Sequence, residues 1–129
     1  EPCPSQTKAD IIFVIDSSDS ITDHHYIKAL SFLAQLVDDF QFGDEDVLFG
    51  MVIYSWSVQK IFDLNTFNNT EDIKKAILAA PHFKSSTLTH KAFDFVNQNN
   101  MFGTEHGGRD NATDILVLMT DGKSGYKDL

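Results

Sequence analysis

Short apolar runs alternate along this chain with segments whose apolar residues recur at helical spacing. Residues 10–16 read DIIFVID and residues 115–119 read ILVLM, without polar alternation in their apolar parts. Runs of this kind are typical of strands that are buried on both faces of a parallel sheet. Residues 47–54 predict another strand. Residues 58–64 predict a partner that forms an antiparallel hairpin with it, because only a short link separates the two.

The segment after the first run predicts an amphipathic helix. Ser20 followed by Asp23 resembles a capping box, so we expect Ser20 to be the N-cap. The helix is expected to end before Gly43 and the acidic residues 44–46. The apolar face expected to contact the core consists of Tyr26, Leu30, Leu33, Val37 and Phe40.

Two further helices are expected between the hairpin and the last apolar run. One begins at residues 68–70 and ends at Pro81, and the other covers residues 90–101 and precedes a polar loop. Alternating strands and helices are typical of an α/β fold with right-handed crossovers. We expect a mostly parallel central sheet with one antiparallel hairpin strand and helices on both faces. Residues 1–8 are expected to be a linker and residues 9–129 one domain.

Composition narrows the class of protein. The chain has 129 residues, 42% of them hydrophobic, and a net charge of −9. This content favours one globular domain over a disordered acidic tail, and no apolar run approaches the roughly 18 residues of a membrane span. The acidic charge argues against nucleic acid and favours divalent cations or basic partners. Two glycosylation sequons, at Asn68 and Asn111, favour secretion. Cys3 is the single cysteine, so it is either a free thiol or is paired outside this chain.

Oxygen-bearing side chains follow the two apolar strands at the ends where ligands bind in such sheets. Asp16 and Asp121 stand at these strand ends, and Asp16, Ser18 and Ser20 occupy alternate positions of one short segment. Hydroxyl residues also gather in segment 85–89, just before an expected helix. Carboxylate and hydroxyl oxygens are hard ligands, which favour Mg²⁺, with Mn²⁺ or Ca²⁺ as alternatives, over Zn²⁺.

This pattern resembles the metal-ion-dependent adhesion site of von Willebrand factor type A domains, also called integrin I-like domains. The resemblance extends over about residues 8–124 and includes three loops in the family's order. The metal ligands that it implies are Asp16, Ser18, Ser20, Thr87 and Asp121. The two aspartates would hold the ion mainly through water. Thr89 is the alternative to Thr87, because Ser85 and Ser86 stand where the family has glycines.

The resemblance is closer to matrix-type members of the family than to integrin subunits. It implies a secreted module that binds collagen or another matrix protein in a cation-dependent way, with a ligand carboxylate on the metal. The alternative is a structural matrix component whose acidic surface associates by charge with calcium, mineral or basic fibrous proteins. Complete members continue beyond the strand before Asp121. We therefore expect the functional protein to be longer, and Cys3 to pair with a later segment or another chain.

Enzymatic readings find little support in the sequence. Gly122, Lys123 and Ser124 mimic the end of a phosphate-binding loop, but that motif needs a glycine where Val117 stands. A phosphatase of the Asp-x-Asp type would need an acid in place of Ser18.

Several other residues keep two interpretations. His24 and His25 either rim a ligand surface or start an exposed helix, Trp56 is either a partner anchor or a turn aromatic, and the acidic residues 44–46 form either a solvated turn or a weak calcium site.

Overall fold

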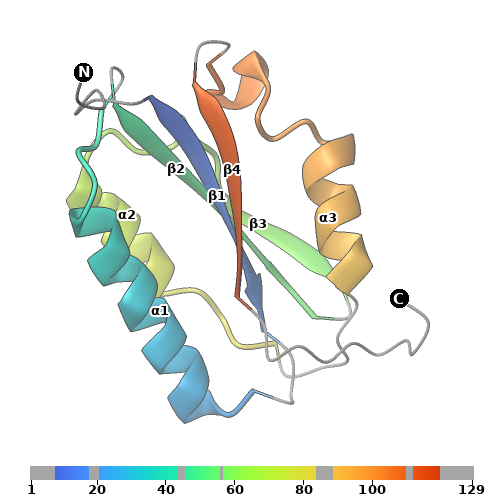
Figure 1. The fold of residues 1–129 in the computed structure, drawn as a ribbon. Coiled ribbons are helices and arrows are strands. Elements are labelled where there is room, and N and C mark those ends of the chain that lie inside the picture. The colour runs from blue at the N-terminus through green and yellow to red at the C-terminus, as the bar shows by residue number, and fades with distance from the viewer. Residues whose placement is uncertain are drawn as a thin grey trace, which may run out of the picture.

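The structure is a computed structural model that describes residues 8–17, 21–43, 46–55, 57–83, 89–109 and 112–119. Within these ranges it forms one sheet with helices on both sides (Figure 1). The elements in chain order are β1 (Ala9–Asp16), α1 (Asp23–Asp38), β2 (Val47–Tyr54), β3 (Val58–Phe62), α2 (Thr70–Leu78), α3 (Thr89–Gln98), the 3₁₀ turn η1 (Thr104–His106) and β4 (Thr113–Met119).

The sheet has the strand order β3-β2-β1-β4, with β1 between its two parallel neighbours. Ile15 of β1 lies opposite Ile53 of β2 and Met119 of β4, so these three strands end at the same edge. The strand β3 pairs with β2 in the antiparallel direction. The predicted fold class, a mostly parallel sheet with one antiparallel hairpin strand, is confirmed.

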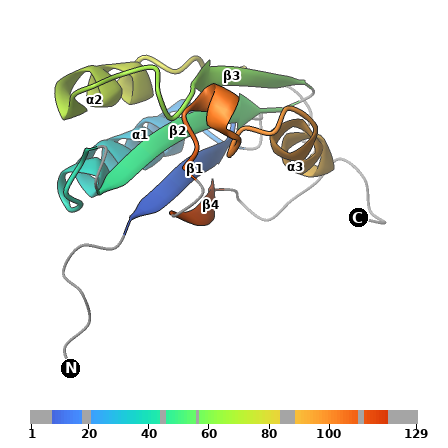
Figure 2. The same cartoon turned by 90° about the horizontal axis from the view of Figure 1, so that it is seen from above.

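Alternate residues of the strands pack into two separate hydrophobic cores, one on each face of the sheet. The helices α1 and α2 cover one face and α3 covers the other (Figure 2). Phe13 and Phe49 stack on the α1 side, with ring centroids 5.6 Å apart. On the opposite face, Val14 and Tyr54 share a core with Val96 of α3. Because β1 is buried on both faces, its continuous apolar run is what the sequence pattern predicted.

A buried ion pair closes the amino end of β1. Asp10 is fully buried, and it accepts hydrogen bonds from the backbone N–H of Arg109 at 2.8 Å and from its Nε at 3.0 Å. Nη2 of Arg109 also donates to the carbonyls of Ala9 and Asp46, at 3.0 and 2.8 Å. The planar guanidinium thus joins the start of β1 to the segments before β2 and β4, and satisfies a carboxylate that would otherwise be costly to bury.

Three expectations about local structure are wrong. The N-cap of α1 is Thr22, whose hydroxyl accepts from the N–H of His25 at 3.2 Å, rather than Ser20. Phe40 lies beyond the end of α1 and stays 41% exposed, although its ring edge reaches Phe49. The strand β4 is not buried on both faces in the part of the chain that the structure describes. It is the outer strand there, so residues such as Ile115 remain partly accessible.

The elements between the hairpin and β4 differ from the expected ones by a few residues. The strand β3 ends at Phe62 instead of 64, and α2 begins after the N-cap Asn69 and stops before Pro81. The helix α3 ends at Gln98, and the expected polar loop contains the turn η1. None of the helices in the described ranges is long and apolar enough to cross a membrane.

Replacing Arg109 should destabilise the fold strongly. Arg109→Ala would leave the Asp10 carboxylate buried without its cation, and such losses cost about 3 kcal/mol or more. We expect the urea midpoint to fall accordingly, with Arg109→Lys intermediate because an ammonium keeps the charge but not the fork of donors. Asp10→Asn added to Arg109→Ala should recover part of the loss. A change of less than about 1 kcal/mol for Arg109→Ala would contradict this account of the ion pair.

Candidate metal centre

Asp16 is the one implied metal ligand that lies within the described residues. It ends β1 opposite Tyr54, and it is 1% exposed. The other four implied ligands lie outside the described residues: Ser18, Ser20, Thr87 and Asp121. The second sequon residue Asn111, the single cysteine Cys3 and Trp56 also lie outside them. The side chain of the alternative ligand Thr89 is not described either, although its backbone begins α3. The five-residue ligand set therefore stays a prediction.

Ser17 connects the end of β1 to the chain segment that leads toward Thr87. Its N–H donates to the carbonyl of Tyr54 at 2.7 Å, which extends the β1–β2 pairing by one bond. Its hydroxyl donates to the carbonyl of Pro81 at 3.0 Å and accepts from the N–H of Phe83 at 2.8 Å. Ser17 is fully buried. Residues 81–83 are thereby held against the strand end that carries Asp16.

Tyr26 strengthens the same junction from the first turn of α1. Its hydroxyl donates to the Pro81 carbonyl at 2.8 Å, and its ring stacks on His82 with centroids 4.4 Å apart and planes 13° apart. Nδ1 of His82 lies 2.7 Å from Oδ1 of Asp23, the first residue of α1. Residues 81–82 therefore contact both the end of β1 and the beginning of α1.

The environment of Tyr26 shifts its protonation equilibrium. Burial raises the pKa of its phenol above the ordinary 10.0, the neighbouring Ser17 hydroxyl lowers it, and the negative charge of Asp16 raises it, so that the net shift is upward. The negative charge of Asp16 is thus one part of the environment of Tyr26. The phenol is a neutral hydrogen-bond donor at ordinary pH, as an unshifted phenol would also be.

The described residues that flank the three predicted loops are Ser17, Phe83 and Met119, and two of them are in direct contact. The segments that carry Ser18 and Thr87 begin at Ser17 and Phe83, which are hydrogen-bonded to each other. The third begins after β4, whose last residue Met119 lies opposite Ile15 in the register. Carboxylate and hydroxyl oxygens suit a hard divalent cation, so the types of the five predicted ligands fit Mg²⁺ or Mn²⁺.

Ser17, Tyr26 and His82 were not identified as site residues from the sequence. Ser17 is one of five adjacent hydroxyl or carboxylate residues, and nothing in the pattern separates it from its neighbours. Tyr26 fits the apolar face of α1, where an apolar ring alone would suffice. A hydroxyl on that face, close to a strand end with candidate ligands, was the available signal. His82 appeared as an isolated histidine.

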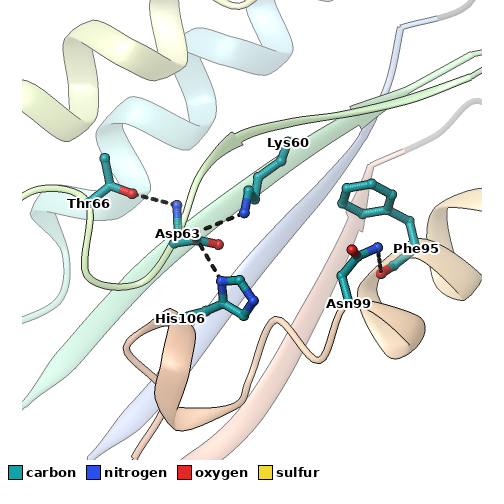
Figure 3. A network of polar contacts seen from close by, with 6 residues as sticks. All are labelled: Lys60, Asp63, Thr66, Phe95, Asn99 and His106. Atoms are coloured by element: carbon teal, nitrogen blue, oxygen red, sulfur yellow. Dashed lines mark hydrogen bonds and ion pairs between the residues drawn. The ribbon is translucent and has the colours of Figure 1, made fainter.

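A second polar cluster lies away from this edge. Oδ2 of Asp63 accepts a hydrogen bond from Nζ of Lys60 at 3.0 Å and lies 3.2 Å from Nδ1 of His106 (Figure 3). The N–H of Asp63 donates to the Thr66 hydroxyl at 2.8 Å. These contacts tie the end of β3 to η1. Asn68 of the first sequon follows Thr66 by two residues, and its side chain is exposed to solvent. Within the described ranges, no group of three or more His, Cys, Asp or Glu side chains is arranged to hold a metal.

Comparison with known proteins gives a consistent family assignment. Residues 10–129 match the family model of the von Willebrand factor type A domain. The chain is 39% identical over 117 residues to the collagen alpha-6(VI) chain of Mus musculus, covering 91% of this chain and 5% of the relative. It is 31% identical over 115 residues to matrilin-1 of Homo sapiens, covering 89% of this chain and 23% of that protein.

A solved structure matches over most of the chain. Proximal thread matrix protein 1 from the mussel byssus, with a zinc-occupied MIDAS motif, superposes with a TM-score of 0.85 at 34% identity, covering 94% of this chain and 33% of that one. These relatives are named as collagen and matrix proteins rather than as enzymes, and they confirm the expected extracellular location. The chain spans a third or less of each relative. The byssus protein holds zinc in its motif, so the expectation that this chain binds Mg²⁺ stays a prediction.

The raised pKa of Tyr26 predicts a specific alkaline behaviour. Because the folded state holds this proton to higher pH than the unfolded state, folding binds protons above about pH 10, and the free energy of unfolding falls as pH rises through that range. The stabilisation is fully present below the unfolded pKa. We expect the difference in tyrosinate absorbance between wild type and Tyr26→Phe to show a phenol that ionises above 10.0. Ionisation of that phenol below 10.0 would contradict the described burial.

Proposed function

This chain belongs to the von Willebrand factor type A domain family, and from that premise we propose that it is an extracellular module that binds a matrix protein through a divalent cation. The ligand is collagen or another matrix protein that offers a carboxylate, and the physiological cation is Mg²⁺. The proposed metal residues are Asp16, Ser18, Ser20, Thr87 and Asp121. The chain acts by recognition and not by turnover.

The observation that carries this proposal is the junction at the carboxyl end of β1. Asp16 is held there in a buried position, and the Ser17 hydroxyl joins the segment after it to the segment that precedes Thr87. Two of the sequence segments with proposed ligands therefore start within hydrogen-bonding distance of each other. A metal ion that took oxygens from both segments would bind next to residues that are already joined, Ser17 and Phe83.

The types of side chain explain why such a centre would recognise a carboxylate. Three of the proposed ligands are neutral hydroxyls, so only two carboxylates offset the charge of a bound divalent cation, which then keeps its attraction for an anionic oxygen. Mg²⁺ demands six oxygens in a near-octahedral arrangement and commonly keeps several waters. An aspartate or glutamate of the matrix ligand can replace one of these waters.

The net charge of −9 supports a second candidate function. A chain with this charge attracts basic fibrous proteins, calcium or mineral over a wide area, without a defined coordination centre. In that case binding would depend on ionic strength and not on a single aspartate. The two functions differ in what removes the binding.

Metal binding is tested directly by titrating Mg²⁺ or Mn²⁺ into the metal-free protein in a calorimeter. We expect one-site binding that Asp121→Ala abolishes and Asp16→Asn weakens strongly, since each removes a proposed carboxylate. Asp39→Ala is the matched control, because Asp39 is an exposed acid at the other end of α1 and its loss changes the net charge equally. If a folded wild-type chain gave no heat of binding with either ion, the proposed centre would be wrong.

Ligand binding distinguishes the two candidate functions. On immobilised fibrillar collagen, we expect wild type to bind in Mg²⁺, and to be released by a chelator and by Asp121→Ala. Raising salt from about 0.15 M to 1 M shortens the screening length from about 8 to 3 Å, and should change a metal-centred contact only modestly. Steep loss in salt with no effect of chelator or Asp121→Ala would favour the charge-driven function.

A further inference from the structure

We propose that Ser17 and Tyr26 are positioning residues of the metal centre, and that their hydroxyls set its metal affinity by fixing the Pro81 carbonyl. This inference rests on the proposed function, since it concerns the same centre. It adds two residues that are not themselves proposed as ligands. We call Ser17, Tyr26 and Pro81 the hydroxyl clamp.

The clamp brings together three parts of the chain that are distant in sequence. Ser17 follows β1, Tyr26 belongs to the first turn of α1, and Pro81 follows α2. The Pro81 carbonyl accepts from Ser17 Oγ at 3.0 Å across 64 residues, and from Tyr26 Oη at 2.8 Å across 55 residues. Both donor residues are almost completely buried, whereas Pro81 is exposed and the two hydrogen bonds are partly buried.

Pro81 is suited to be the shared acceptor. A proline has no backbone N–H, so its carbonyl is its only polar backbone group, and its ring restricts φ to about −65°. Two residues later, the N–H of Phe83 donates to Ser17 Oγ at 2.8 Å. Ser17 thus acts on both sides of His82, as a donor to Pro81 and as an acceptor from Phe83. Residues 81–83 are fixed at two points by one side chain.

His82 fixes the position of the Tyr26 ring. The two rings stack at 4.4 Å, and Nδ1 of His82 lies 2.7 Å from Oδ1 of Asp23. Removing only the Tyr26 hydroxyl, as in Tyr26→Phe, keeps this stack and the apolar contacts of the ring with the core. The variant therefore tests the hydrogen bond to Pro81 with little change in packing.

The clamp lies close in sequence to the proposed ligands on both sides. Ser18 follows Ser17 directly, and Thr87 follows Phe83 by four residues. An ion that takes oxygens from both segments and a clamp that joins the same segments favour the same arrangement. We therefore expect the clamp to increase metal affinity, and thermodynamic linkage then requires that metal binding strengthen the clamp by the same factor.

The first test is the affinity for Mn²⁺ by calorimetry. A typical intramolecular hydrogen bond contributes about 1 kcal/mol, so we expect Tyr26→Phe to weaken binding roughly threefold to tenfold, and Ser17→Ala at least as much because it removes two bonds. Thr66→Ala is the matched control. It also removes a hydroxyl that bonds to the backbone, but Thr66 follows β3, away from β1's carboxyl end (Figure 3). Equal affinities in wild type, Tyr26→Phe and Ser17→Ala would overturn the clamp's role.

The second test measures the reverse direction of the linkage. We expect Mg²⁺ to slow hydrogen exchange of the Phe83 amide severalfold in wild type but not in Asp121→Ala. A clamp with a merely structural role would leave this exchange rate unchanged by metal. Unchanged exchange in a metal-saturated wild-type protein would overturn the inference while leaving the proposed function intact. If the folded wild type bound neither ion, both the proposed function and the inference would fail.

Discussion

The complete burial of β1 is the constraint on which the rest of the structure depends. All eight residues of this strand are buried, including an aspartate near its beginning and one at its end. A strand in this position needs hydrogen-bonding neighbours on both sides and apolar cover on both faces. The parallel pairing with β2 and β4 and the two layers of helices meet those needs. Asp16 is thereby placed at a fixed point of the carboxyl edge.

The two buried aspartates of β1 are surrounded by different chemistry. Asp10 is paired with the guanidinium of Arg109, which is charged at any relevant pH and binds three carbonyl or carboxylate groups besides donating from its own backbone N–H. At the other end, Asp16 lies near the neutral hydroxyls of Ser17 and Tyr26. The amino end of β1 is therefore fixed by an ion pair, and the carboxyl end has features compatible with cation binding.

The strands β1 and β2 were predictable because burial on both faces produces continuous apolar runs, and β4 has such a run although it is the outer strand of the described sheet. The helices followed from spacing, although α1 begins later than expected because Thr22, and not Ser20, caps it. The place of Asp16 at the end of a buried strand was predictable, while its role as a metal ligand stays a prediction. Ser17 and Tyr26 were not, because their bonds to Pro81 join residues that are 64 and 55 positions apart. Local patterns carry no information on such pairs, and a buried tyrosine resembles any other core aromatic.

Neutral hydroxyls are the appropriate groups to hold together two segments that also bind a cation. A lysine in place of Tyr26 would reach the Pro81 carbonyl, but its charge would attract Asp16 and repel a divalent ion. A carboxylate in place of Ser17 could not donate to that carbonyl and would need a counter-ion of its own. Hydroxyls join the segments without adding charge, because the phenol of Tyr26, like the hydroxyl of Ser17, is neutral at ordinary pH. The clamp and a bound cation can therefore stabilise the same arrangement without competing for the same carboxylates.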